Sequence, residues 1–157
     1  MKTIAAIFLA VIGCAPLTAQ TEFLKPEGLA PSPSYSHVVV ASPGKMIFIA
    51  GQVANDKQGK VVGKDDLKAQ ATQVFENLKT ALAAAGATFN DVVKINWYVK
   101  GYKPEYLPTL REVRSAYVNK DKPPASTLVG VAALFQDDYL LEVDAIAVVP
   151  EKHHRKK

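Results

Sequence analysis

Two amphipathic helical patterns separate the strand-like segments of this chain. Apolar residues recur at helical spacing between Asp65 and Ala85. This stripe consists of Leu67, Ala71, Val74, Phe75, Leu78 and Leu82. Asp65 and Asp66 favour the positive end of the helix dipole, and Gly86 is the expected C-terminal stop. A second helix is predicted from about Pro108 to Val118, and its buried stripe is Leu110, Val113 and Tyr117.

Five segments have strand patterns, because they are rich in β-branched residues or alternate apolar with polar side chains. They are His37–Ala41, Met46–Val53, Val93–Lys100, Ser126–Ala133 and Tyr139–Val149. Turn residues between the first two and between the last two predict two hairpins. The order strand–strand–helix–strand–helix–strand–strand (ββαβαββ) predicts an α+β fold. A mixed sheet would carry both helices on one face.

The second strand segment is apolar on both of its faces. Ile47 and Ile49 point one way, whereas Met46, Phe48 and Ala50 point the other. Two helices can cover only one face of such a sheet, and another copy of the chain is the simplest cover for the other. We therefore expect a homo-oligomer, in which a site between subunits would be natural.

The 157 residues predict one domain, at 34–150, behind a lead-in at 20–33. Residues 151–157 form a basic tail that we expect to be disordered. The tail supplies much of the formal charge of +4, but without interleaved aromatic residues it is weak evidence for nucleic-acid binding. A single cysteine, Cys14, excludes a disulfide scaffold.

Residues 1–19 read as a signal peptide. Lys2 precedes an apolar run from Thr3 to Ile12 that is too short to span a bilayer, and Ala15–Ala19 resembles a small-residue cleavage site. This pattern predicts export to the periplasm or the medium. Because Val11–Cys14 also fits a bacterial lipoprotein box, a lipid anchor on Cys14 remains the alternative, and only that would bring the chain to a membrane.

Six short motifs stand in order between Leu29 and Val149. They are Pro33–Tyr35, Ile49–Gln52, Ala84–Gly86, Asp91–Lys94, Pro124–Ala125 and Leu141–Ala147. Together they resemble the RidA/YjgF family of reactive-intermediate deaminases, also called endoribonuclease L-PSP-like proteins. The resemblance implies a chorismate-mutase-like trimer with clefts between subunits. It also implies cofactor-free and metal-free hydrolysis of 2-imino or enamine acids to 2-keto acids and ammonia.

The resemblance also implies a site. Glu142 matches the family position that orients the attacking water. Tyr35, Ala50, Gly51 and Ser126 match substrate-binding positions. Ser126 departs from the family pattern, because the deaminases carry there an arginine whose guanidinium binds the substrate carboxylate at two points. A serine offers one neutral donor, so the pocket is expected to persist without its usual carboxylate anchor.

Several residues have two interpretations. Glu142 is either the base or a strand carboxylate paired with Lys94 or Lys100, and its place between apolar residues on a predicted central strand favours the base. Arg111 stands where an asparagine is usual. It either reaches the cleft and supplies a cation or is solvated beside Arg114.

Other side chains near the site have either a structural interpretation or two open ones. Asp144 shares a face with Glu142 and is expected to be structural, and Trp97 is expected to pack in the core. Tyr35 either donates into the cleft or simply packs. Thr127, like Ser126, either binds a neutral ligand or bonds its local backbone.

Three functions compete. The chain is an exported imine deaminase, a non-catalytic binder of a small metabolite in the same cleft, or a ribonuclease or translation inhibitor. The ribonuclease is disfavoured, since no metal-ligand cluster is present and His37 is the one histidine outside the tail. The expected partners are thus a small molecule, such as a 2-imino or 2-keto acid, and further copies of the chain, without nucleic acid.

Overall fold

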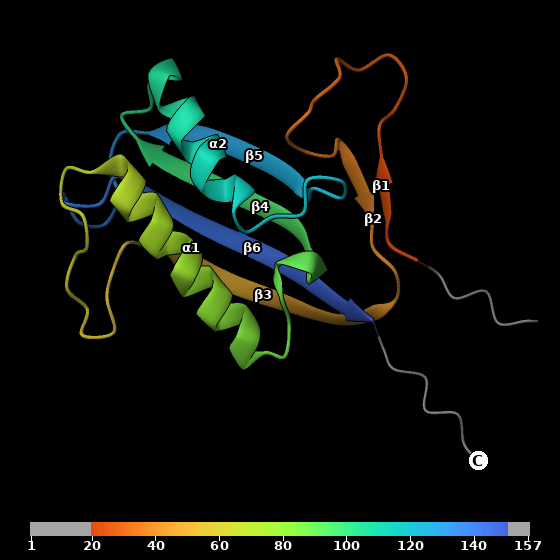
Figure 1. Ribbon diagram of the computed structural model, residues 1–157, viewed down its shortest axis with the longest axis horizontal. Helices are drawn as coiled ribbons and strands as arrows, with labels where there is room; N and C mark the ends of the chain where they lie inside the picture. Colours follow the sequence, from red (N-terminus) through yellow and green to blue (C-terminus); the bar gives the residue numbers. More distant parts are fainter. Residues whose placement is uncertain (1–19, 151–157) are drawn as a thin grey trace, which may run out of the picture.

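A mixed four-stranded sheet, covered on one face by two helices, forms the body of the protein in the computed structural model, which describes residues 20–150 (Figure 1). Its strands are β3 (Gly44–Gln52), β4 (Val92–Lys100), β5 (Ala125–Val131) and β6 (Leu141–Pro150). They lie in the order β3-β6-β4-β5; β6 runs antiparallel to both neighbours, and β4 and β5 are parallel. The predicted α+β class and the central position of the strand that carries Glu142 are confirmed.

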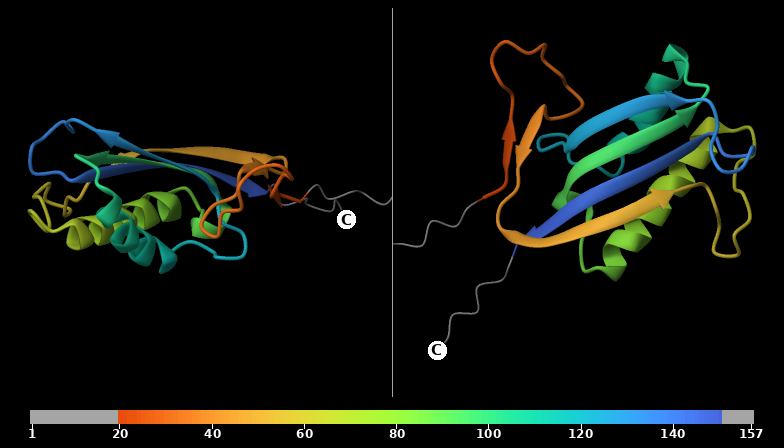
Figure 2. Two further views of the ribbon diagram at one scale, coloured as in Figure 1. Left: turned by 90° about the horizontal axis from the view of Figure 1, so that it is seen from above. Right: turned by 180° about the vertical axis from the view of Figure 1, so that it is seen from behind.

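Both helices lie on the same face of this sheet, as predicted (Figure 2). Helix α1 (Leu67–Ala84) crosses β3 and β6, and α2 (Leu107–Ser115) lies over β4 and β5 (Figure 1). Two short 3-10 helices, η1 (Phe89–Asp91) and η2 (Pro104–Tyr106), lead into β4 and α2. This arrangement leaves the other face of the sheet free of helices.

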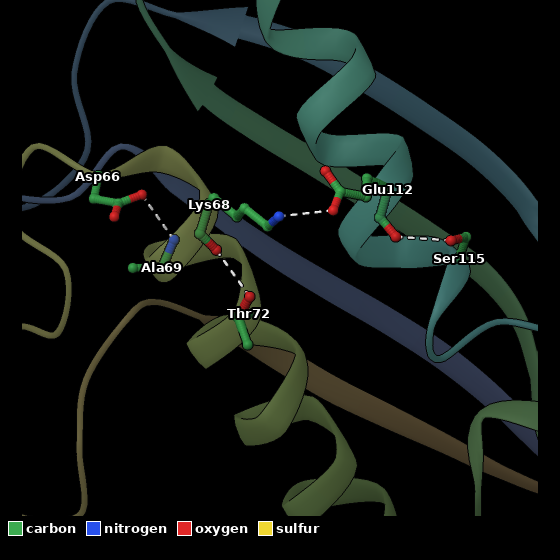
Figure 3. Close-up of polar contacts among 6 residues, drawn as sticks. All are labelled: Asp66, Lys68, Ala69, Thr72, Glu112 and Ser115. Carbon is green, nitrogen blue, oxygen red and sulfur yellow. Dashed lines mark hydrogen bonds and ion pairs between the residues drawn. The ribbon is translucent and has the colours of Figure 1, made fainter.

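The ends of α1 follow from its flanking residues. The side chain of Asp66 caps the helix by accepting a hydrogen bond of 3.0 Å from the backbone N–H of Ala69 (Figure 3). Gly86 has a φ of 74°, the left-handed conformation that ends helices, so the predicted stop is confirmed. Asp65, predicted as the first residue, lies before the cap.

The core lies between the helices and the sheet. Five of the six stripe residues predicted for α1 are fully buried, and Leu67 is partly buried. Gln70 is also fully buried, but it was not predicted to be, because the predicted stripe contained only apolar residues. Its amide donates to the carbonyl of Asp138 (2.7 Å) and accepts from the N–H of Leu140 (2.8 Å), so this glutamine fixes the entry into β6.

The two predicted hairpins are wrong. Strand β2 (Val38–Val40) pairs with β1 (Glu22–Leu24) from the lead-in, not with β3. Strand β3 pairs with β6, and β4 separates β6 from β5. The parallel pair β4–β5 requires a crossover connection, which α2 supplies, so strands that are neighbours in sequence are not neighbours in the sheet.

The helix-free face carries exposed apolar side chains. Met46 is 57% exposed and Phe48 is 71% exposed on β3, and Val129 is 41% exposed on β5. The uncovered apolar face that the sequence predicted is therefore present. A homo-oligomer that covers it remains a proposal.

No helix within residues 20–150 is long and apolar enough to cross a membrane. The predicted signal peptide, with Cys14, and the basic tail at 151–157 lie outside the described residues.

Candidate functional site

Glu142 lies on the helix-free face of the central strand β6. Its cross-strand neighbour on β4 is Tyr98. On the other side, the pairing with β3 is interrupted by a bulge between Ile49 and Gln52. Gly51 lies in this bulge, and a Cβ there would overlap the Glu142 carboxylate. The absence of a side chain at position 51 therefore makes the space in which the carboxylate lies.

Glu142 has no polar partner among the described residues, although it is half-buried. The two lysines considered as partners are engaged elsewhere: Lys94 donates to the hydroxyl of Thr127, and Lys100 donates to the carbonyl of Asp137 (2.8 Å). The structural pairing that competed with the catalytic interpretation is absent from residues 20–150. A carboxylate in this state has free lone pairs that can accept a proton from water.

Asp144, two residues further along β6, has the structural role expected for it. Its carboxylate accepts hydrogen bonds from the amide of Asn96 (2.8 Å) and the hydroxyl of Tyr98 (3.1 Å). The hydrogen bond from the Tyr98 hydroxyl to Asp144 is the largest cause of a raised pKa of Tyr98. The charge of Asp144, burial and the charge of Glu142 raise this pKa further, in that order. Asp144 is thus satisfied, and Glu142 is the uncommitted acid of the strand.

Three other predicted residues, Tyr35, Arg111 and Ser126, line a hollow between α2 and the start of β5. The side chain and N–H of Ser36 donate to the carbonyls of Pro123 (2.7 Å) and Pro124 (3.3 Å), which brings Tyr35 beside Ser126. The hollow has a volume of about 120 Å³. Its wall includes Tyr35, Trp97, Arg111, Arg114, Ser126 and Leu128, and we call it the α2–β5 hollow. Trp97 is 3% exposed and packs against Phe75, so its predicted core role is confirmed.

The six predicted site residues fall into two groups on opposite faces of the sheet. Ser126 pairs in register with Ile95, which is buried beneath the helices, whereas Glu142 pairs with Tyr98 on the helix-free face. Tyr35 and Arg111 belong with Ser126. Ala50 and Gly51, on β3, belong with Glu142. One chain therefore does not bring the acid and the α2–β5 hollow together.

Sequence reasoning missed Arg114. Arg114 was expected to be solvated, but it is half-buried and faces the α2–β5 hollow, which the exposed Arg111 also lines. Burial, followed by the nearby charge of Arg111, lowers the pKa of Arg114. The three-residue spacing of the two arginines on one helix was the available signal, since it places them on the same side.

No group of three or more His, Cys, Asp or Glu side chains that could hold a metal occurs among residues 20–150.

The sequence and the fold are similar to those of known proteins. A family model described as Endoribonuclease L-PSP matches residues 26–149. A RutC family protein of Pyrococcus horikoshii is 40% identical over 119 residues, which are 75% of this chain and 90% of that protein. A 2-iminobutanoate/2-iminopropanoate deaminase of Dermatophagoides farinae is 27% identical over 121 residues, 77% of this chain and 91% of that protein. A crystal structure of a Rid family protein of unknown function from Yersinia pestis matches with a TM-score of 0.75 at 35% identity, covering 83% of this chain and 100% of that one.

Proposed function

Because this chain belongs to the RidA/YjgF family, whose model is described as Endoribonuclease L-PSP, we propose that it hydrolyses small 2-imino acids to 2-keto acids and ammonia. The site is an inter-subunit cleft of a homo-oligomer, a trimer by family resemblance. Glu142 of one copy faces the α2–β5 hollow of the next. The deaminase name of the Dermatophagoides farinae relative supports this chemistry.

The half-buried carboxylate of Glu142, without a partner among the described residues, is the observation that carries the proposal. It lies on the face whose exposed apolar side chains, Met46 and Phe48, favour contact with another copy. The α2–β5 hollow lies on the opposite face of the sheet. Only association between copies can therefore join the two groups into one site.

The chemistry requires a base and a place for the substrate carboxylate. Glu142 accepts a proton from water as the water oxygen bonds to the imine carbon, which gives a carbinolamine. The proton then passes to the nitrogen. Ammonia leaves as the C–N bond breaks and the keto group forms. Glu142 takes the hydroxyl proton of the carbinolamine and passes it to the departing nitrogen, so the carboxylate is left in its starting state.

Decay of 2-iminobutanoate, released by a dehydratase, tests the proposal. We expect the purified protein to accelerate this decay, and Glu142→Gln to reduce the acceleration by roughly 10²- to 10⁴-fold, the range typical of a lost general base. Glu112→Gln, the same change at an exposed carboxylate on α2, is the matched control and should leave the rate unchanged. Equal decay with and without the wild-type protein would remove the enzymatic function.

A non-catalytic binding protein is the second candidate, and Ser126 favours it. This residue offers one neutral hydroxyl where the resemblance implies a two-point cationic clamp. If the protein binds a ligand without catalysis, 2-oxobutanoate should bind saturably while 2-iminobutanoate decays at its uncatalysed rate. Ribonuclease activity remains disfavoured. Within residues 20–150 the one histidine, His37, bonds through its ring to the carbonyl of Ala30 (2.8 Å).

Export is part of the proposal and rests on residues 1–19 alone. The mass of the mature chain purified from its own cells tests it. A chain that begins at Gln20 supports a soluble exported protein, a lipid-bearing Cys14 supports the anchored alternative, and an intact chain contradicts both.

A further inference from the structure

Two guanidinium groups on α2 lie over the start of β5. Arg111 and Arg114 are three residues apart and therefore share one side of the helix. Both line the α2–β5 hollow and also an adjoining hollow of about 190 Å³. The two hollows share Ser34 as well, so they meet at the arginines.

Arg114 has no hydrogen-bond acceptor for its guanidinium among residues 20–150. Its Nε is fully buried and has no partner in that range. Neither arginine takes part in an ion pair within residues 20–150, where the ion pairs involve lysines. A half-buried guanidinium with one unsatisfied donor beside a like charge is unfavourable, and an anion bound by its other N–H groups would offset the charge.

The surroundings indicate what kind of anion fits. Neither hollow has a carboxylate among its lining residues, and Lys120 adds a third cation to the adjoining one. The hydroxyls of Tyr35 and Ser126 offer neutral donors. Trp97 and Leu128 provide an apolar wall. This combination suits a small carboxylic acid that carries a short aliphatic or keto-bearing chain.

We propose that Arg114, assisted by Arg111, binds the carboxylate of the ligand, so that the cation absent from position 126 on β5 is supplied from α2. A guanidinium on α2 can reach the same hollow as a side chain at position 126, because residues of both α2 and β5 line this hollow. The planar fork of an arginine retains two-point recognition of a carboxylate. This inference deepens the proposed function by naming the residue that holds the substrate, and it can be tested without turnover.

Calorimetric binding of 2-oxobutanoate, a stable keto acid, provides the test. We expect Arg114→Met to weaken binding about 10- to 100-fold, the range for losing a charge-assisted pair, and Arg111→Met to weaken it less. The uncharged 2-oxobutanamide should bind the wild type as weakly as 2-oxobutanoate binds Arg114→Met. Lys79→Met, which removes an exposed cation on α1, is the control and should leave binding unchanged.

Two further measurements separate binding from folding. Arg114→Met should unfold at the same temperature as the wild type or a higher one, because it removes a half-buried charge without an ion-pair partner. Adding Ser126→Arg to Arg114→Met should restore binding, since it returns a guanidinium to the hollow from β5. A merely structural role for Arg114 would not give this rescue.

Wild-type affinity in Arg114→Met, or equal affinity of the wild type for acid and amide, would overturn the inference. Its failure is distinguishable from failure of the proposed function. If the wild type hydrolyses 2-iminobutanoate and Arg114→Met does so equally well, the carboxylate-binding role of Arg114 is wrong and the proposed hydrolytic function is supported. If Arg114→Met no longer binds 2-oxobutanoate and the wild type shows no hydrolysis, the carboxylate-binding role of Arg114 is supported and the proposed hydrolytic function is wrong.

Discussion

At the residue scale, Gly51 and Glu142 share one space across the bulge of β3. Gly51→Ala would put a methyl group where the carboxylate lies, and the flexible end of Glu142 would have to turn away. We expect hydrolysis of 2-iminobutanoate to fall at least tenfold while the free energy of unfolding changes by less than about 0.5 kcal/mol, as at other surface positions. Lys45→Ala, at an exposed position of the same strand outside the site, is the control for a general effect on β3. Full activity in Gly51→Ala would show that the position of this carboxylate does not matter.

Tyr117 gives a pH dependence that can be measured. Burial, followed by its 2.8 Å hydrogen bond to Glu76 and the charge of that residue, raises the pKa of Tyr117 to about 12. An unfolded tyrosine titrates near 10, so between these values the folded state binds more protons and stability falls as pH rises. The wild type should therefore lose about 1 kcal/mol relative to Tyr117→Phe from pH 10 to 12, after allowance for solvent screening. Urea unfolding of both proteins across this range measures the difference, and parallel curves would contradict the raised pKa.

Single positions were predictable where strand alternation fixes the environment. The sequence placed Glu142 among apolar neighbours on a central strand, and it lies there half-buried. Arg114 was misjudged because its exposure depends on where α2 lies over the sheet. That position follows from packing, and the helical period of a nine-residue helix does not define it.

At the scale of elements, the strand segments were predicted well and their partners were not. Local alternation identifies a strand, but pairing depends on connections that pass over the sheet. The segment that became β5 was expected to pair with β6, yet it lies parallel to β4 at the edge. The short β1 was missed because its three residues lie in a lead-in that contains several Pro, Gly and Ser residues.

The cap of α1 and the ion pair between the helices should differ in their contribution to stability (Figure 3). Asp66→Ala removes the acceptor for the N–H of Ala69 and should lower the free energy of unfolding by about 1 kcal/mol. Lys68→Ala breaks a 2.7 Å pair with Glu112, but side chains that are 58% and 62% exposed contribute little, so a smaller loss than that of Asp66→Ala is expected. Denaturant unfolding of both variants compares them, and a larger loss for Lys68→Ala would reverse this ranking.

At the scale of the whole molecule, the helix-free face decides whether the site can exist (Figure 2). Phe48 is 71% exposed there, so in a monomer Phe48→Glu should change folding stability little. In the proposed oligomer it places a charge in an apolar contact and should lower the mass measured by light scattering towards that of one chain. Ala83→Glu, at an exposed position of α1, should leave the mass unchanged. A wild type that is already monomeric would contradict the inter-subunit cleft.

The mixing of two defective chains tests the shared cleft most directly. Glu142→Gln removes the base on one face, and Ser126→Glu places a negative charge in the α2–β5 hollow on the other. Each variant alone should fail to hydrolyse 2-iminobutanoate. Mixed oligomers from co-expression should recover about a quarter of the wild-type rate, since about one interface in four then joins two intact faces. Mixed oligomers as inactive as either variant alone would contradict a site built from two copies.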